Sequence, residues 1–148
     1  MSTTIFTARQ YNPEKERRKR QIIVAVVCAV IIVAALLYTF RNWTYERRVD
    51  QFFSAIQQQD YKKAYGIWMN DPAWEQHPQK YTQYPFDDFY RDWGPGGEWG
   101  LVKTYKVVGS ARPKGGSGVI VVVRVNDRVE QARLWVEKKD KTLTWSPY

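Results

Sequence analysis

Cysteine is almost missing from this 148-residue chain, in which Cys28 is the only one. A single cysteine forms no intramolecular disulfide and builds no cysteine-based zinc site. Any folded part of the chain must therefore be stable through its apolar core. The sequence holds 7 Trp and 10 Tyr, most of them after residue 40, and such rings bury a large apolar area in a small domain.

Charge is absent from residues 21–40, and Gly and Pro are absent as well. From residue 22 onward this segment reads IIVAVVCAVIIVAALLYTF. A helix of that length spans about 28 Å, which is close to the thickness of the hydrocarbon layer of a bilayer. The sequence therefore predicts one transmembrane helix over residues 21–40.

Basic residues gather on the N-terminal side of the apolar segment. They are Arg9, Lys15, Arg17, Arg18, Lys19 and Arg20. Fewer basic residues follow the segment closely, and the positive-inside rule then places the N-terminus in the cytoplasm. We expect a basic cytoplasmic tail over 1–20 and an extracytoplasmic domain over 41–148, held at an inner or plasma membrane.

Two other interpretations of the apolar segment are a cleaved signal peptide and a lipoprotein anchor. The first needs a small-x-small cleavage site, which residues 37–41 do not offer. The second needs a small residue before Cys28, where the chain has Val27. Within the membrane, a face of small side chains would let a second helix approach closely, although Ala is also common in any membrane span. That face consists of Ala25, Cys28, Ala29 and Ala35.

Residues 41–148 are predicted to form an α+β domain, with helices first and strands after them. Apolar residues at helical spacing predict three helices, over 49–56, 61–68 and 86–93. Asp60 is placed to cap the second helix, and Pro85 precedes the third. β-prone segments then predict about four antiparallel strands, at 102–108, 119–125, 129–137 and 143–145. With the transmembrane helix, the expected fold is four helices and a curved antiparallel sheet on which the last three helices pack.

The first two of these helices carry a pattern that resembles the opening of the nuclear-transport-factor-2-like superfamily. The residues concerned are Val49, Phe52, Phe53, Ala55, Ile56, Asp60, Tyr61, Ala64, Tyr65 and Trp68. The resemblance covers about residues 45–148 and implies a strongly curved sheet wrapped around the helices as a cone. An unrelated α+β sandwich is the alternative.

Some members of that superfamily are enzymes that use a His–Asp pair, or a Tyr with buried carboxylic acids, inside the cone. Here the one histidine, His77, lies in a loop with no partner evident from the sequence. Asp87 and Asp88 are adjacent and point in different directions on a helix, whereas Asp92 is four residues from Asp88 but also fits a solvated face. The chain has no nucleophile motif, phosphate-binding glycine pattern or metal cluster. We therefore expect no catalysis, no cofactor and no metal.

Two candidate binding surfaces remain. The first is an aromatic pocket at the mouth of the cone for a small apolar ligand, although the same rings would also make an ordinary core. Its candidate residues are Trp68, Trp74, Tyr81, Tyr84, Phe86 and Trp93. The second is the strand Val119, Ile120, Val121, Val122 and Val123, which is apolar on both faces. One face must cover the helices, and the other is expected to contact a protein partner.

The sequence therefore favours an interaction module rather than an enzyme. Residues 41–148 carry 17 basic and 13 acidic side chains in dispersed positions, which argues against a nucleic-acid groove. The expected partners are the lipid bilayer and either a membrane protein or a second copy of the chain. By analogy, we expect an accessory or assembly subunit of a larger membrane complex, of which respiratory and photosynthetic complexes are examples. The alternative function is an extracytoplasmic binder of a small apolar ligand.

Overall fold

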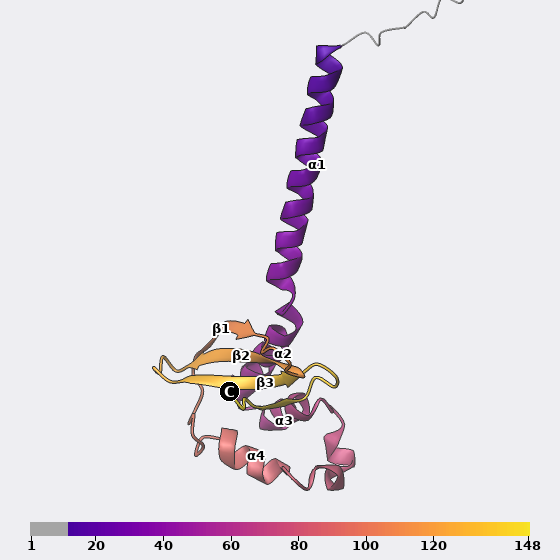
Figure 1. The fold of residues 1–148 in the computed structure, drawn as a ribbon. Helices are drawn as coiled ribbons and strands as arrows, with labels where there is room; N and C mark the ends of the chain where they lie inside the picture. The colour runs from indigo at the N-terminus through magenta and orange to yellow at the C-terminus, as the bar shows by residue number, and fades with distance from the viewer. Residues whose placement is uncertain (1–11) are drawn as a thin grey trace, which may run out of the picture. The chain divides into compact units, whose positions relative to one another are not determined.

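The computed structural model describes residues 12–148 and divides the chain into two compact units. Unit 1 ends at Arg41, and unit 2 runs from Asn42 to Tyr148. Figure 1 shows unit 1 as a long helix and unit 2 as a sheet with shorter helices. The two units are described separately below.

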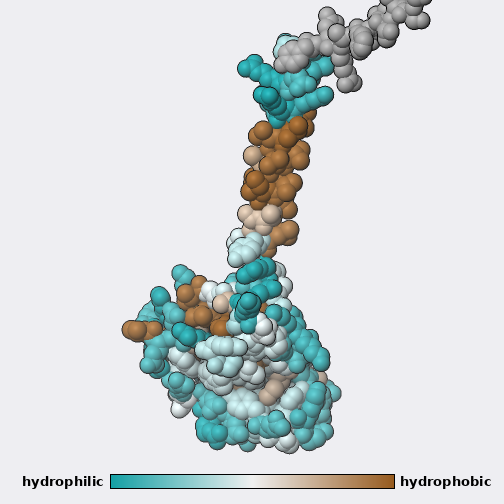
Figure 2. Space-filling model, in the orientation of Figure 1, coloured by the Kyte–Doolittle hydropathy of each residue, from teal (hydrophilic) through white to brown (hydrophobic). Residues whose placement is uncertain are grey.

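Unit 1 consists of helix α1, Pro13–Phe40. The side chain of Asn12 accepts hydrogen bonds from the backbone N–H groups of Glu14 and Lys15, and Pro13 occupies the first turn, where proline is tolerated. No residue of α1 is buried. Within residues 12–148, α1 belongs to the one helix that is long and apolar enough to cross a membrane, by length and composition. Figure 2 shows its apolar part as a brown band beyond a teal, basic end.

Helix α1 begins before the predicted transmembrane segment, 21–40, and includes part of the predicted basic tail, of which residues 1–11 lie outside the described residues. Residues 13–20 already belong to α1, so the basic side chains from Lys15 to Arg20 are helical. The physical reason is the cap at Asn12, together with Glu14 and Glu16, whose charges are favourable in the first turn of a helix.

Unit 2 begins with the helices α2, Trp43–Gln57, and α3, Tyr61–Met69. Asp60 caps α3 as predicted, because its Oδ1 accepts from the backbone N–H of Lys63 at 3.1 Å. A loop with two short 3₁₀ helices, η1 (Trp74–Gln76) and η2 (Pro78–Tyr81), leads to α4, Phe86–Trp93.

Four strands complete unit 2: β1 (Tyr105–Ala111), β2 (Gly118–Val125), β3 (Gln131–Glu137) and β4 (Leu143–Trp145). They form one antiparallel sheet in the order β1-β2-β3-β4, and this sheet is not closed. Asn126 and Asp127 both have positive φ in the turn after β2, a conformation that Asn and Asp tolerate well. The predicted α+β fold class is therefore confirmed.

Strand β1 begins three residues later than the sequence pattern predicts. The backbone N–H groups of Lys103 and Thr104 donate to Oδ1 of Asn126, at 2.7 and 3.1 Å, instead of to a neighbouring strand. Val102 is buried without belonging to a strand. Val102 is therefore buried as its apolar side chain predicts, but the backbone after it donates hydrogen bonds to the side chain of Asn126 and does not pair with a neighbouring strand.

The core of unit 2 lies between the inner face of the sheet and the helices, with α2 against β1, β2 and β3, α3 against β4, and α4 against α3. Arg48 of α2 ties three segments together. Its guanidinium donates to the carbonyls of Lys141 and Ile67 and to Oδ1 of Asn70, at 2.9, 2.7 and 2.6 Å. Partial burial lowers the pKa of Arg48 below its usual value, and these acceptors satisfy the charged group.

Candidate functional site

Strand β2 alternates between a buried and a partly exposed face. Val119, Val121 and Val123 are fully buried against the helices, whereas Ile120 and Val122 lie on the opposite, outer face. The five consecutive residues expected to bind a partner are therefore separated by the pleat of the strand. Three of them are core residues, and only Ile120 and Val122 are available to a second molecule.

The strands beside β2 extend this outer face. Ile120 pairs with Ala111 of β1 and Trp135 of β3. A bulge in β1 sets Val108 and Gly109 opposite Val122, and Val108 is 49% exposed. Figure 2 shows brown surface among teal over β1 and β2. We call the apolar residues of this face the outer strip. The outer strip consists of Val108, Ala111, Ile120, Val122 and Trp135.

Trp135 packs closely against β2 and the loop before it, because glycine occupies two positions there. A Cβ atom added to Gly118 would clash with the indole of Trp135, and a Cβ atom added to Gly116 would lie 2.9 Å from Cη2 of the same ring. Glycine at both positions thus permits the close approach of the ring. The indole Nε1 donates to Glu137 at 3.3 Å, and the Tyr148 ring lies 5.8 Å away, centroid to centroid. Trp135 is only 8% exposed, so it forms a largely buried, fixed end of the outer strip, and Val108, Ile120 and Val122 are its more accessible members.

Cations border the outer strip at the other end. Lys106 and Arg124 are directly opposite each other on β1 and β2, and Arg133 of β3 pairs with Val122. All three side chains are exposed, and none makes an ion pair with another residue of 12–148. Like charges directly opposite each other in a sheet are destabilising. This end of the face therefore carries a positive charge that the described part of the chain does not neutralise.

Glu137, at the Trp135 end of the face, already has partners. Its carboxylate accepts from Ser117 Oγ at 2.7 Å, from the Trp135 indole and from the backbone N–H of Lys138. The hydrogen bond from Ser117 is the main reason that the pKa of Glu137 is lowered, so this group is ionised at neutral pH. Its charge is held at its own end of the face, away from the three cations.

The aromatic residues expected to line a ligand pocket instead pack against one another in the core. Trp68 and Trp93 are buried with ring centroids 5.6 Å apart, and Trp93 stacks on Trp145 at 4.7 Å. Trp74 stacks on Phe86 at 5.1 Å, and Tyr81 contacts the same group through Tyr65. Trp68 and Trp93 thus pack as in an ordinary core, whereas Trp74 and Phe86, with Tyr65, also line a hollow at the surface.

His77 has a partner that the sequence did not reveal. Its Nε2 lies 2.5 Å from Oδ2 of Asp71, and the Tyr81 hydroxyl donates to the same oxygen at 2.5 Å. Hydrogen bonds from Tyr81 and His77 lower the pKa of Asp71. Burial and the bond to Asp71 raise the pKa of Tyr81 to about 12. The sequence did not indicate this partner of His77, and the three groups fasten the loop between α3 and α4.

The three aspartates of α4 do not form a facing pair. Asp88 accepts from Arg91 at 2.8 Å, Asp92 accepts from the Tyr84 hydroxyl at 2.9 Å, and Asp87 is exposed. Burial and the bond to Asp92 raise the pKa of Tyr84 far above its usual value. Asp88 and Asp92 thus have different hydrogen-bond partners, although the charges of both act on the Tyr84 hydroxyl.

The small side chains expected to form a helix contact, Ala25, Cys28, Ala29 and Ala35, all lie exposed on α1. At about 100° per residue they occupy roughly one third of the helix circumference.

Comparisons of the chain with models of protein families, with curated proteins and with solved structures gave no match. The site must therefore be interpreted from its own geometry.

Proposed function

We propose that this chain is a non-catalytic interaction module anchored in a membrane, and an accessory or assembly subunit of a larger membrane complex. The observation that carries the proposal is the outer strip, whose residues Val108, Ile120 and Val122 remain partly exposed beside three cations that make no ion pair within residues 12–148. Exposed apolar strips of this kind usually mark a contact with another molecule.

The anchor is α1. Its apolar side chains between Ile22 and Phe40 are largely exposed, and residues 12–148 offer them no core to enter. A bilayer would cover them along their whole length. With the basic end in the cytoplasm, unit 2 lies on the far side, where the anchor raises its effective concentration for a neighbour in the same membrane.

The partner that fits the outer strip is a protein surface that is apolar at its centre and carries carboxylates beside it. Such carboxylates would relieve the repulsion between Lys106 and Arg124 and would pair with Arg133. A second copy of this chain fits less well. A two-fold interface brings the same patch together with itself, and the one carboxylate on the face, Glu137, is already engaged.

The order of elements in unit 2, with three helices followed by an antiparallel sheet, supports the proposed kinship with the nuclear-transport-factor-2-like superfamily. The outer face of such a sheet is a surface that members of that superfamily use for association. The close packing of Trp68 and Trp93, which are both buried, favours an interaction role over the binding of a small apolar ligand between them.

A photo-crosslinking amino acid at Ile120 or Val122, in the full chain in its native membrane, tests the proposal. We expect each position to give an adduct with one and the same protein. The control is the same amino acid at Val129, which is 99% exposed but lies beyond the strands, and which should give no such adduct. Reversing the three cations, Lys106→Glu, Arg124→Glu and Arg133→Glu, should abolish the adducts without changing the fold.

Three results would count against the proposal. Adducts with a second copy of the chain would replace the hetero-complex by a homodimer. The absence of adducts at Ile120 and Val122 would remove the interaction surface. A chain that purifies alone with a bound apolar compound would favour the ligand-binding alternative.

A further inference from the structure

The basic residues next to the apolar segment belong to the same helix as that segment. Helix α1 runs without a break from Pro13 to Phe40, through the change from charged to apolar residues after Arg20. The positions of these cations along the helix axis are therefore fixed relative to Ile22. We call the five residues the basic collar. The basic collar consists of Lys15, Arg17, Arg18, Lys19 and Arg20.

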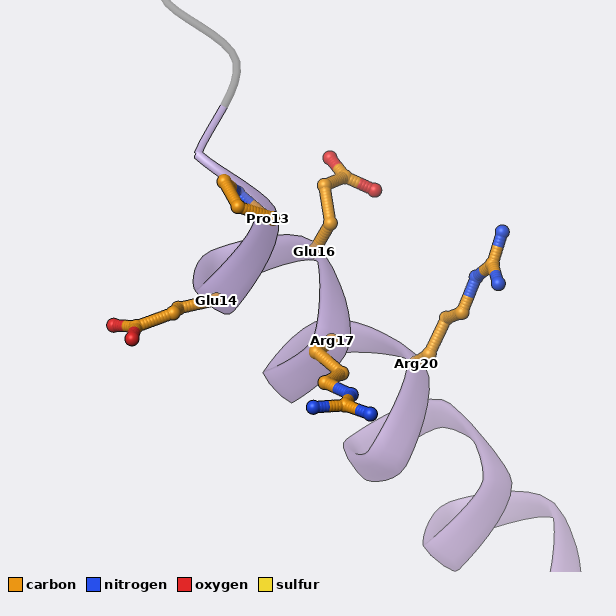
Figure 3. A pocket seen from close by; sticks show the side chains of 5 residues that line it. All are labelled: Pro13, Glu14, Glu16, Arg17 and Arg20. Carbon is orange, nitrogen blue, oxygen red and sulfur yellow. The ribbon is translucent and has the colours of Figure 1, made fainter.

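The basic collar surrounds the helix axis. At about 100° per residue, Lys15, Arg18 and Lys19 lie on one side of α1, whereas Arg17 and Arg20 lie on the other. Figure 3 shows the two arginines of the second side, Arg17 and Arg20, whose side chains point apart as they leave the helix. A groove-binding or docking helix would instead place its cations along one face, with an apolar face opposite.

The collar is free to bind anions. Its five side chains are exposed, and none of them has an ion pair or hydrogen bond from its side chain to another residue of 12–148. The two carboxylates nearby, Glu14 and Glu16, extend from the first turn of the helix into solvent (Figure 3). The shallow hollow beside them is lined by α1 alone, so it is not an enclosed site for a single small ligand.

The length of the collar matches the depth of a lipid headgroup layer. From Lys15 to Arg20 the helix rises about 7.5 Å. A bilayer of about 40–45 Å with a hydrocarbon layer of about 30 Å leaves roughly 5–7 Å for the headgroups on each side. The collar begins where the apolar segment ends, so a spanning α1 places its cations at the depth of the phosphates.

We propose that the basic collar is a binding site for anionic phospholipid headgroups, which form a selected ring of lipids around α1. This inference rests on the proposed function, because it requires α1 to span the bilayer. Guanidinium and ammonium groups pair well with phosphate oxygens, and basic residues beside a membrane span attract anionic lipid. A ring of cations binds a ring of headgroups, because lipids approach a single span from every side.

The test uses the full chain in vesicles of phosphatidylcholine and phosphatidylglycerol, with a trace of either lipid carrying a spin label. Electron paramagnetic resonance measures the fraction of each labelled lipid that is immobilised at the protein. We expect a preference for phosphatidylglycerol in the unmodified chain. Replacing all five collar residues by Gln should lower that preference by about threefold or more. Raising the salt concentration should also weaken it.

Two partial variants test the ring geometry. One carries Lys15→Gln, Arg18→Gln and Lys19→Gln, and the other carries Arg17→Gln and Arg20→Gln. We expect each to lose part of the preference. Loss of the whole preference in one variant and none in the other would replace the ring by a one-sided site. Replacing Arg17, Arg18 and Arg20 by Lys keeps the charge and should keep most of the preference.

Extraction of the vesicles with alkaline carbonate separates this inference from the proposed function. A chain that stays in the membrane but shows no lipid preference overturns the inference alone. A chain that is released from the membrane overturns the anchor as well, and with it the proposed function.

Discussion

Helix α1 has no buried residue, whereas α2 buries five apolar side chains in the core of unit 2. Both are helices rich in apolar residues, but only α2 is amphipathic, with charged positions such as Arg47 and Asp50 on its exposed side. Unit 2 therefore supplies the apolar surroundings of its own helices. Within residues 12–148 nothing buries the apolar side chains of α1.

The same contrast recurs on a smaller scale across strand β2. Val121 lies in the core of unit 2, and Val122, the next residue, lies partly exposed on the outer strip. Apolar residues that are buried within the fold determine its stability. Apolar residues that stay exposed are candidates for contacts with another molecule. The predictions below test this distinction.

The largest expected effect concerns α1. Replacing Val30 and Val33 by Arg places two charges near the centre of the apolar segment, at a cost to membrane insertion of about 6 kcal/mol. We expect alkaline carbonate to release this variant from membranes and to leave the control, with Leu at both positions, in the pellet. All seven tryptophans lie between residues 43 and 145, so an unchanged tryptophan fluorescence would show that unit 2 remains folded.

If the variant stayed in the membrane, the result would contradict the proposed difference between α1, which needs a bilayer around it, and unit 2, which buries its own helices. It would also do so if unit 2 lost its native fluorescence together with the anchor, because the two units would then depend on one another.

The next effect concerns the two faces of β2. Val121→Lys buries a charge without a partner and should destabilise unit 2 by about 4 kcal/mol or more. Val122→Lys places the same charge on the outer face and should cost less than about 1 kcal/mol. Urea unfolding in detergent, followed by tryptophan fluorescence, measures both. Similar losses from the two substitutions would show that the outer face is more deeply packed than its exposure indicates.

A smaller effect is expected at Arg48, where a charged group is satisfied inside unit 2. Arg48→Met keeps much of the side-chain volume but leaves the carbonyls of Lys141 and Ile67 without this donor. We expect a loss of about 2 kcal/mol in the free energy of unfolding, since hydrogen bonds of charged groups contribute about 1.5–3 kcal/mol. Arg48→Lys should recover only part, because Lys cannot reproduce the planar set of donors. A neutral Arg48→Met would show that water replaces these bonds.

The sequence was sufficient for most of the fold because its signals were local. Helical spacing of apolar residues located α2, α3 and α4, and the cap at Asp60 located the start of α3. The start of α1 was missed although its signal, Asn12 followed by Pro13 and Glu14, was also local. Strand β1 was misplaced because Asn126, more than twenty residues away, binds the backbone before it.

Only part of the candidate site was predictable, because local sequence patterns identified the strand β2 but not the residues that lie beside it in the sheet. Alternation in β2 indicated that Ile120 or Val121, but not both, would face outward. The outer face brings Ile120 and Val122 next to Trp135, Arg133 and Lys106. This proximity depends on the pairing register of three strands and on the bulge in β1, and no local sequence pattern determines either of them. The partner of His77 was hidden because the loop folds back on itself through two 3₁₀ turns.

The smallest expected effect is on pH dependence, and it arises at Asp71. Hydrogen bonds from Tyr81 and His77 lower the pKa of Asp71 in the folded chain below its ordinary value of 3.8. Their stabilisation is therefore complete above about pH 4 and is lost as the pH falls through the lower, folded value. Replacing Asp71 by Asn should lower the urea midpoint at pH 6 and reduce its further decrease towards pH 3. Glu130→Gln, at an exposed carboxylate outside the helices with no side-chain hydrogen bond to another described residue, is the matched control and should leave both unchanged. If Asp71→Asn preserved the full acid dependence, the loop between α3 and α4 would be held by its aromatic packing alone, and the His77–Asp71–Tyr81 contact would have no part in the stability of unit 2.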